Sequence, residues 1–303
     1  MYEKILLPLD GSELAETALP YAEKLAGLLG SEIILANVSE SPSGHGEDKN
    51  LGYLQKMVEV TKEGASAYSA KTNGLSISVR SVILSGQPAE KIVEYAGNEN
   101  IGLIVMATHG QSGIQRWALG SVADKVVRAT DRPVILIRAK SARPDVRVKG
   151  LLNKMLVPLD GSKEGEAVIP FIEELASRFL VKVILIQILA KGYDAVYQYI
   201  PLPEQQIESD KAHAIEYLNN IGALLKAKGI AVEERLGIGS ISGNAAEQII
   251  KFADEAQVDF LAMTTHGRSG VGRWAFGSTA EKILQAGNTP LLLVRSPGAG
   301  GEQ

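Results

Sequence analysis

The chain carries the heptapeptide LLPLDGS at residues 6–12 and a near copy of it, LVPLDGS, at residues 156–162. A longer block is repeated in the same way, because THGQSGIQRWALGS at residues 108–121 returns as THGRSGVGRWAFGS at residues 265–278. The two blocks follow one another in the same order and at a similar distance in both halves. Self-similarity of this kind is the sequence signature of a duplicated unit. We therefore expect two copies of one domain.

Each half alternates strand-like and helix-like segments. In the first half we expect strands near 4–9, 32–38, 75–84, 101–107 and 134–138, and helices near 12–30, 51–71, 88–99 and 120–129. In the second half the strand signals fall near 154–159, 182–188, 230–236, 258–263 and 291–295. Strands that alternate with helices form a parallel sheet with right-handed crossovers and helices on both faces. The predicted fold class is α/β, with two doubly wound domains.

The length of 303 residues is too great for one compact α/β unit of about 150 residues and suits two. We expect domains at 1–139 and 152–297, a polar linker at 140–151 and a flexible tail at 298–303. We also expect the two domains to form an intramolecular pseudo-dimer through their last strands, because an uncovered apolar edge strand is prone to aggregate. The sequence leaves open whether two chains also form a homodimer.

The composition excludes several classes of protein. Hydrophobic residues make up 45% of the chain and charged residues 22%, as in ordinary globular proteins. With 31 basic against 35 acidic residues, no basic field exists to hold nucleic acid or an anionic membrane. The absence of cysteine excludes disulfides, thiolate metal sites and a cysteine nucleophile. Apolar runs fall short of the roughly 18 residues of a membrane span, so we expect a cytoplasmic protein without a metal centre.

The repeated blocks lie where a ligand would bind. In open parallel sheets, ligands bind outside the carboxyl ends of the strands, at the point where the strand order reverses. Asp10 closes the first expected strand and His109-Gly110 follows the fourth, so both blocks would face one crevice. Gly120-Ser121 opens a helix, whose unpaired N–H groups and dipole favour phosphate. Asp10 could accept hydrogen bonds from ribose hydroxyls, and a nucleotide would suit this arrangement.

A structural interpretation of the same residues stays open. Glycines at strand-to-helix turns are often only turn residues, and an Asp before Gly-Ser is equally a helix cap. The recurrence of both blocks together in both halves favours a binding site. The chain contains no G-x-x-x-x-G-K-[ST] sequence, so it is not a P-loop nucleoside triphosphatase.

With these motifs, each half resembles a universal stress protein domain, and the whole chain is similar to a tandem universal stress protein. Nucleotide-binding members of that family carry Gly-x-x-Gly, nine residues, and then Gly-[Ser/Thr]. The matching residues are Gly110 with Gly120-Ser121 in the first half, and Gly267 with Gly277-Ser278 in the second. The first motif glycine is replaced by Ala107 in one half and by Thr264 in the other.

The resemblance implies a five-stranded sheet in the order 3-2-1-4-5 in each half, the adenine nucleotide alpha hydrolase-like fold. It also implies ATP or another adenine nucleotide as the cofactor, with magnesium held, if at all, through the phosphates. Carried over by position, the binding residues of the first half are Pro8, Leu9, Asp10, Val38, Met106, Ala107, Gly110, Gln111, Gly120, Ser121 and Val122. The corresponding residues of the second half are Pro158, Leu159, Asp160, Ile188, Met263, Thr264, Gly267, Arg268, Gly277, Ser278 and Thr279.

The two predicted sites are not equivalent. Thr264 adds a branched side chain where the first half has Ala107, so we expect the first half to bind nucleotide more tightly. His109 and His266 lie in the predicted loops, and we interpret them as stabilising those loops rather than as catalytic bases. We assign no catalytic residue.

Three functions are compatible with the sequence. The leading hypothesis is a regulatory module of a stress-response protein whose state depends on bound adenine nucleotide. The alternatives are a slow nucleotide hydrolase or transferase, and an interaction protein that binds no nucleotide. The sequence has no carboxylate cluster for magnesium beside the glycine-rich loop and no evident base, so we expect any hydrolysis to be slow.

Overall fold

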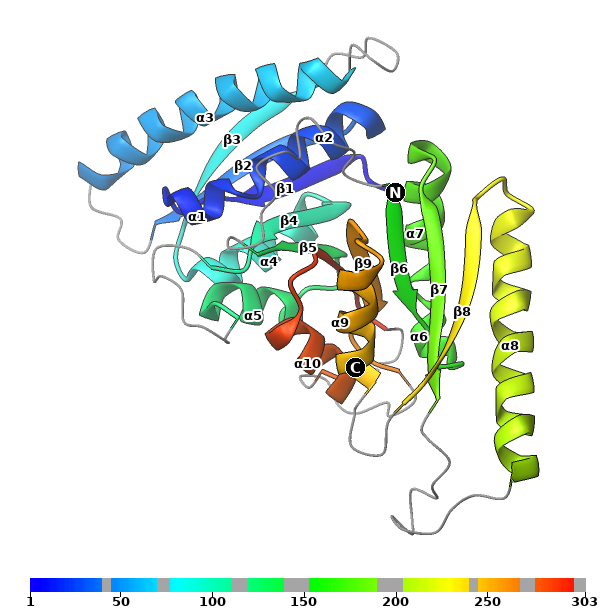
Figure 1. Ribbon diagram of the computed structural model, residues 1–303. Coiled ribbons are helices and arrows are strands. Elements are labelled where there is room, and N and C mark those ends of the chain that lie inside the picture. The colour runs from blue at the N-terminus through cyan, green and yellow to red at the C-terminus, as the bar shows by residue number, and fades with distance from the viewer. Residues whose placement is uncertain are drawn as a thin grey trace. The chain divides into compact units, whose positions relative to one another are not determined.

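The computed structural model describes residues 1–39, 45–69, 77–109, 119–138, 153–189, 204–239, 245–267 and 276–296 (Figure 1). The chain divides into two compact units. The first comprises Met1–Leu151 with Pro290–Arg295, and the second comprises Leu152–Thr289 with Ser296–Gln303. The expected linker and tail lie outside the described residues.

The first unit is a doubly wound α/β domain. Its elements are β1 (Lys4–Pro8), α1 (Glu13–Glu16), α2 (Leu19–Leu29), β2 (Glu32–Ser39), α3 (His45–Ser69), β3 (Val79–Ser85), α4 (Pro88–Asn98), β4 (Leu103–Ala107), α5 (Ser121–Ala129) and β5 (Val134–Ile137). The strand order is β3-β2-β1-β4-β5 and all four pairs are parallel, which confirms the predicted order for this half.

A sixth strand, β10 (Leu291–Val294), completes the first unit. It pairs antiparallel with β5, with Leu292 opposite Ile135. The pairing expected between the last strands of the two halves is therefore present.

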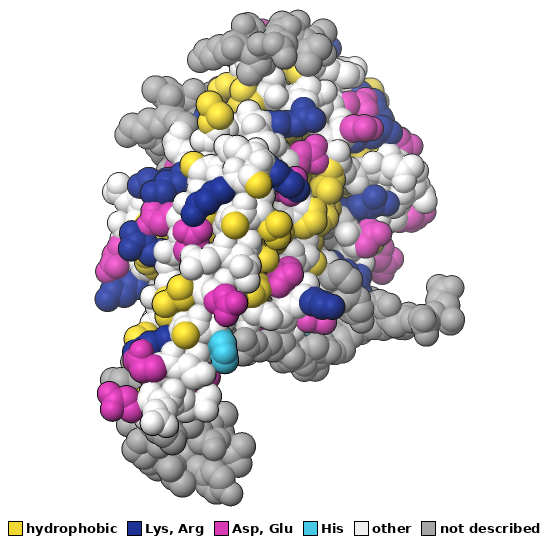
Figure 2. All heavy atoms as spheres, turned by 90° about the vertical axis from the view of Figure 1, so that its right-hand side faces the viewer, with side chains coloured by type: hydrophobic (Ala, Val, Ile, Leu, Met, Phe, Trp, Pro, Cys, Tyr) yellow, Lys and Arg dark blue, Asp and Glu magenta, His cyan; other side chains and the backbone are white. Residues whose placement is uncertain are grey.

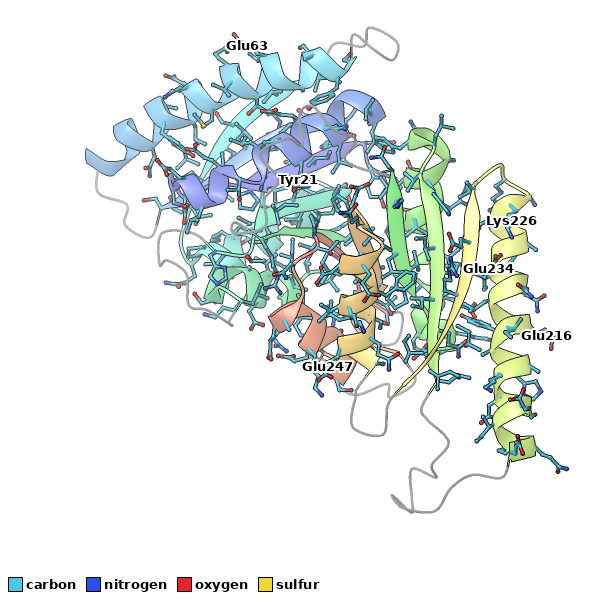
Figure 3. All side chains as sticks on the ribbon, in the orientation of Figure 1. Tyr21, Glu63, Glu216, Lys226, Glu234 and Glu247 are labelled. Atoms are coloured by element: carbon cyan, nitrogen blue, oxygen red, sulfur yellow. The ribbon has the colours of Figure 1, made fainter. Side chains whose placement is uncertain are left out.

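The second unit repeats most of this arrangement. Its elements are β6 (Lys154–Pro158), α6 (Lys163–Glu166), α7 (Ile169–Phe179), β7 (Lys182–Leu189), α8 (Glu204–Lys226), β8 (Val232–Ile238), α9 (Ala245–Glu255), β9 (Phe260–Thr264) and α10 (Ser278–Ala286). The parallel strands β8-β7-β6-β9 follow the order of β3-β2-β1-β4. Lys226 of α8 and Glu234 of β8 form an ion pair of 2.7 Å that links this helix to the neighbouring strand (Figure 3).

The core of each unit lies on its central strands. Ile5, Leu6 and Leu7 of β1 have no exposed surface, and every residue of β4 and β9 is buried. Continuous apolar runs of this kind are expected of parallel strands that helices cover on both faces. In the first unit α2 packs on α3 and α4 packs on α5, which supplies the covering layers (Figure 1).

Two predicted helix boundaries are wrong. The helix expected at 12–30 is two helices, α1 and α2, because Pro20 lacks an N–H and its ring would clash with the carbonyl of Glu16. In the second half, Pro170 separates α6 from α7 in the same way. The helix expected to begin at 51 begins at His45, six residues earlier, although Gly46 and Asn50 have a weak local helix preference.

The surface has no field of one sign on the face seen in Figure 2, where Lys and Arg side chains are interspersed with Asp and Glu. Lys211 with Glu208 and Lys228 with Glu173 are examples of such pairs. Among the helices that the structure describes, none is both long and apolar enough to cross a bilayer.

Candidate functional site

A cavity of about 540 Å³ lies in the first unit, at the carboxyl ends of β1, β2 and β4 and at the start of α5. Every described residue of the first-half prediction lines it, namely Pro8, Leu9, Asp10, Val38, Met106, Ala107, Gly120, Ser121 and Val122. The two remaining predicted residues, Gly110 and Gln111, lie outside the described residues. The folded chain thus brings together side chains from four separate segments.

Asp10 at the rim of this cavity has a second, structural role. Its Oδ1 accepts hydrogen bonds from the backbone N–H of Ser12 at 3.0 Å and from the Ser12 hydroxyl at 2.6 Å. Ser12 Oγ in turn accepts from the backbone N–H of Ala15 at 3.2 Å and caps α1. Gly11 between them has φ +83°, a left-handed conformation that favours glycine. The turn therefore holds the Asp10 carboxylate in place at the cavity.

The start of α5 is held against the end of β4. The backbone N–H of Gly120 donates to the carbonyl of Thr108 at 2.9 Å. A Cβ at Gly120 would lie 2.6 Å from that carbonyl oxygen, so glycine is required for this close approach. The N-cap residue of α5, Gly120, has no side chain to cap the first turn, so the N–H groups and dipole of the helix make this end of the cavity suitable for an anion.

The two loop histidines make local contacts. Thr108 Oγ1 lies 3.0 Å from His109 Nδ1, and Thr265 Oγ1 lies 3.0 Å from His266 Nδ1. His266 is held further by Ser296, whose hydroxyl donates to the His266 carbonyl at 3.0 Å. These are the contacts of histidines that stabilise a loop.

Several lining residues were not predicted from the sequence. They are Ala15, Ala36, Asn37, Ser39, Asn50, Pro88, Ile92, Thr108, His109 and Ala123. Asn37 is 5% exposed, and its Nδ2 donates to the Leu9 carbonyl at 2.8 Å, which joins the ends of β1 and β2. Ala36 could have been found from the two-residue period of a strand, since it lies two residues before Val38 and therefore on the same face.

The helix α3 is tied to this region through Tyr53. The Tyr53 hydroxyl donates to Glu16 Oε1 at 2.9 Å, which joins α3 to α1. Burial, and then the hydrogen bond to Glu16, raise the pKa of Tyr53 well above its ordinary value.

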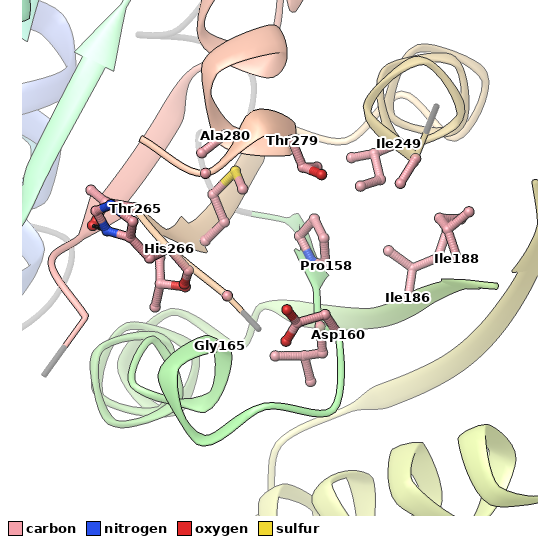
Figure 4. A pocket seen from close by; sticks show the side chains of 16 residues that line it. Pro158, Asp160, Gly165, Ile186, Ile188, Ile249, Thr265, His266, Thr279 and Ala280 are labelled. Carbon is pink, nitrogen blue, oxygen red and sulfur yellow. Dashed lines mark hydrogen bonds between the residues drawn. The ribbon is translucent and has the colours of Figure 1, made fainter. Parts of the chain in front are cut away.

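The second unit has a cavity of about 110 Å³ at the corresponding place (Figure 4). The predicted residues that line it are Pro158, Leu159, Asp160, Ile188, Met263, Thr264, Gly267, Gly277 and Thr279. Ser278 is exposed at the start of α10 and is not part of the lining, and Arg268 lies outside the described residues.

The second half also explains one glycine of the shared motif. A Cβ at Gly267 would collide with the carboxylate of Asp160, so any other residue there would require this side chain or the loop to shift. Asp160 itself accepts from the backbone N–H of Ser162 at 3.0 Å, as Asp10 does from Ser12. Thr264 is 5% exposed, and its hydroxyl donates to the His266 carbonyl at 2.6 Å. The Thr264 hydroxyl is therefore already engaged within the chain.

The described part of the chain contains no cluster of side chains that could hold a metal ion. No three Asp, Glu or His side chains gather there as a ligand set. The first cavity has the size and lining of a pocket for a small ligand, since such pockets commonly enclose about 300–1,000 Å³ and combine apolar walls with a few polar groups.

Comparison with known proteins agrees with the repeat and the fold. The model of the universal stress protein family matches residues 1–138 and 152–295. Universal stress protein MJ0577 of Methanocaldococcus jannaschii is 28% identical over 159 residues, which are 47% of this chain and 98% of that protein. A universal stress protein of Synechocystis sp. is 22% identical over 317 residues and covers 97% of this chain and 100% of its own length.

Solved structures support the same assignment at the level of the fold. A universal stress protein from Archaeoglobus fulgidus superposes with a TM-score of 0.67 at 19% identity, over 97% of this chain and 96% of that one. The family model accounts for both halves, and a relative of full length carries the match across the chain. The chain therefore belongs to the universal stress protein family and contains two copies of its domain.

Proposed function

We propose that the chain is a regulatory module that binds ATP or a related adenine nucleotide in the cavity of its first half. The observation that carries this proposal is the convergence of the strand ends of β1, β2 and β4 and the start of α5 on one cavity of about 540 Å³. This is the edge of a doubly wound sheet at which ligands bind.

The chemistry of the lining suits the three parts of a nucleotide. Val38 and Met106 offer apolar surface to the base, and the Asp10 carboxylate can accept hydrogen bonds from ribose hydroxyls. Gly120 and Ser121 offer the uncapped start of α5 to the phosphates. Magnesium, when bound, would neutralise phosphate charge, with the phosphates as its principal ligands.

A nucleotide in this cavity would contact elements from separate parts of the chain. Asp10 belongs to the turn before α1, Asn50 to α3 and Ser121 to α5. A ligand that binds only the folded state stabilises it by RT ln(1 + [L]/Kd), about 2.7 kcal/mol at a hundredfold excess over Kd. Occupancy would thus alter the stability of these elements and of any surface that they present to a partner.

The direct test is to ask whether nucleotide accompanies the full chain. The purified protein is denatured and the released small molecules are identified by mass spectrometry. The emptied protein is then titrated calorimetrically with ATP, ADP, AMP, cAMP and, as a control for the base, GTP. Binding of at least one adenine nucleotide is expected, with weaker binding of GTP. No retained nucleotide and no heat at millimolar ligand would refute the proposal and favour an interaction protein without nucleotide.

The same preparation distinguishes regulation from catalysis. Phosphate release is followed under saturating ATP and magnesium. A regulatory site predicts turnover well below about 1 per second, the lower end of ordinary enzyme rates. Faster turnover would favour the hydrolase hypothesis.

A further inference from the structure

We propose that Ile186 and Thr264 close the second cavity to nucleotides, so that the chain binds one adenine nucleotide, in its first half. This inference rests on the proposed function and adds its stoichiometry and the residues that determine it. The two cavities occupy corresponding places, but the first encloses about 540 Å³ and the second about 110 Å³. The second value falls below the usual range of ligand pockets, about 300–1,000 Å³.

Ala36 and Ile186, whose side chains differ by more atoms than those of the other corresponding wall residues, have the same backbone pairing in the two halves. Ala36 on β2 is opposite Pro8, and Ile186 on β7 is opposite Pro158. The Ala36 carbonyl accepts from the N–H of Leu9 at 2.8 Å, and the corresponding bond in the second half is also 2.8 Å. The difference therefore lies in the side chain, and isoleucine has three carbon atoms more than alanine.

Ile186 lies in the wall of the second cavity. It is 3% exposed and lines the cavity together with Ile188. Figure 4 shows the two side chains next to each other, on the side of the cavity opposite His266. This is the part of the site whose counterpart in the first half, at Ala36 and Val38, would receive the base.

Thr264 narrows the cavity from a second strand. It replaces Ala107, and its hydroxyl is held by the His266 carbonyl at 2.6 Å. A β-branched side chain has few χ1 rotamers, and this bond selects one of them. The methyl group of Thr264 therefore cannot rotate freely away from an incoming ligand.

Other differences between the linings do not offset these two. Gly165 in place of Ala15 and Ala245 in place of Pro88 together return three carbon atoms of space, fewer than the five heavy atoms that Ile186 and Thr264 add. A Cβ at Gly165 would lie 2.7 Å from Asp160 Oδ1. Ile188 has one carbon more than Val38, but its Cδ1 lies against Gly237, where a Cβ would collide with it. The strand β8 thus accommodates Ile188, which leaves Ile186 and Thr264 as the residues that fill the site.

Reciprocal exchange of the two residue pairs tests the inference. Nucleotide stoichiometry is measured on the full chain, emptied of ligand, by calorimetry and by equilibrium dialysis with labelled ATP. The unaltered chain is expected to bind one ATP. Ile186→Ala with Thr264→Ala gives the second half the residues of the first and is expected to bind two. Ala36→Ile with Ala107→Thr is expected to weaken binding in the first half by about 10- to 100-fold.

A matched control lies next to Ile186. Gln187→Asn also brings in the first-half residue, but Gln187 does not line the second cavity, so the stoichiometry should remain one. Circular dichroism and thermal melting check that each variant is folded. If the double change in the second half does not fold, Thr264→Ala alone is expected to give weak binding of a second ATP.

The outcomes separate this inference from the proposed function. Two ATP bound to the unaltered chain, one ATP bound to the opened variant, or unchanged affinity in the filled first half would each overturn the inference while leaving nucleotide binding in place. Failure of the unaltered chain and of every variant to bind any adenine nucleotide would instead refute the proposed function itself.

Discussion

Asp10 has two roles that substitution can separate. Its Oδ1 accepts two hydrogen bonds from Ser12, at 3.0 and 2.6 Å, and its carboxylate lies at the rim of the first cavity. Asp10→Ala removes both the turn and the proposed ribose contact. Asp10→Asn keeps a side-chain oxygen that can accept from the Ser12 N–H but removes the charge.

The magnitudes follow from the bonds that each variant loses. Hydrogen bonds to a charged group contribute about 1.5–3 kcal/mol, so loss of the ribose contact should raise the Kd for ATP about 10- to 100-fold in both variants. Loss of the Ser12 bonds should also lower the free energy of unfolding of Asp10→Ala by about 1–3 kcal/mol, because a typical net bond contributes about 0.5–1.5 kcal/mol. Asp10→Asn should retain most of its stability.

Calorimetric titration gives the affinities, and urea unfolding followed by circular dichroism gives the stabilities. The matched control is Asp160→Ala, because Asp160 makes the corresponding bond to Ser162 at 3.0 Å. It should lose stability without a change in the Kd for ATP. If both Asp10 variants bind ATP as tightly as the unaltered chain, Asp10 does not contact the ligand and the assignment of the rim is wrong.

Three further predictions concern a glycine, a leucine with a left-handed backbone and a half-buried tyrosine. Gly120→Ala should destabilise the chain and weaken ATP binding, because the new Cβ would lie 2.6 Å from the Thr108 carbonyl oxygen. Gly277→Ala should leave the free energy of unfolding in urea unchanged, because its Cβ would lie 3.5 Å from the Thr265 carbonyl oxygen. Leu180 is 90% exposed and has φ +54°, a conformation that is strained for leucine, so Leu180→Gly should raise the free energy of unfolding by about 0.5–1 kcal/mol. A variant with a lower free energy of unfolding than the unaltered chain would contradict this backbone strain. Burial and Glu16 raise the pKa of Tyr53 above its ordinary 10.0, so the folded state keeps a proton that the unfolded state loses. The stabilisation is complete below about pH 10 and declines as pH rises further, and Tyr53→Phe should make this alkaline decline shallower in thermal melts. An unchanged alkaline profile in Tyr53→Phe would exclude the tyrosine as its source.

The repeat and its periodicity were sufficient to predict the fold class, and the strand order of the first half followed from the family resemblance. Apolar runs such as 101–107 and helix starts such as Ser12 are encoded within short windows of sequence, which is why they can be recognised without coordinates. Pro20 and Pro170 carried a local signal for the helix break as well, and the prediction overlooked it. The start of α3 had no such signal, because glycine and asparagine within its first turns are weak helix formers.

The sequence by itself determined which residues recur at the strand ends, and the family resemblance added the other residues of the candidate site from Pro8 to Val122. Only the tertiary structure decided how much space those residues enclose. Ala36 and Ile186 occupy equivalent positions in two similar strands, and neither belongs to a recognisable motif. Their effect depends on side chains that approach from other strands and helices, Thr264 among them. A volume is set by all the groups that meet around it, whereas a motif is set by neighbours along the chain.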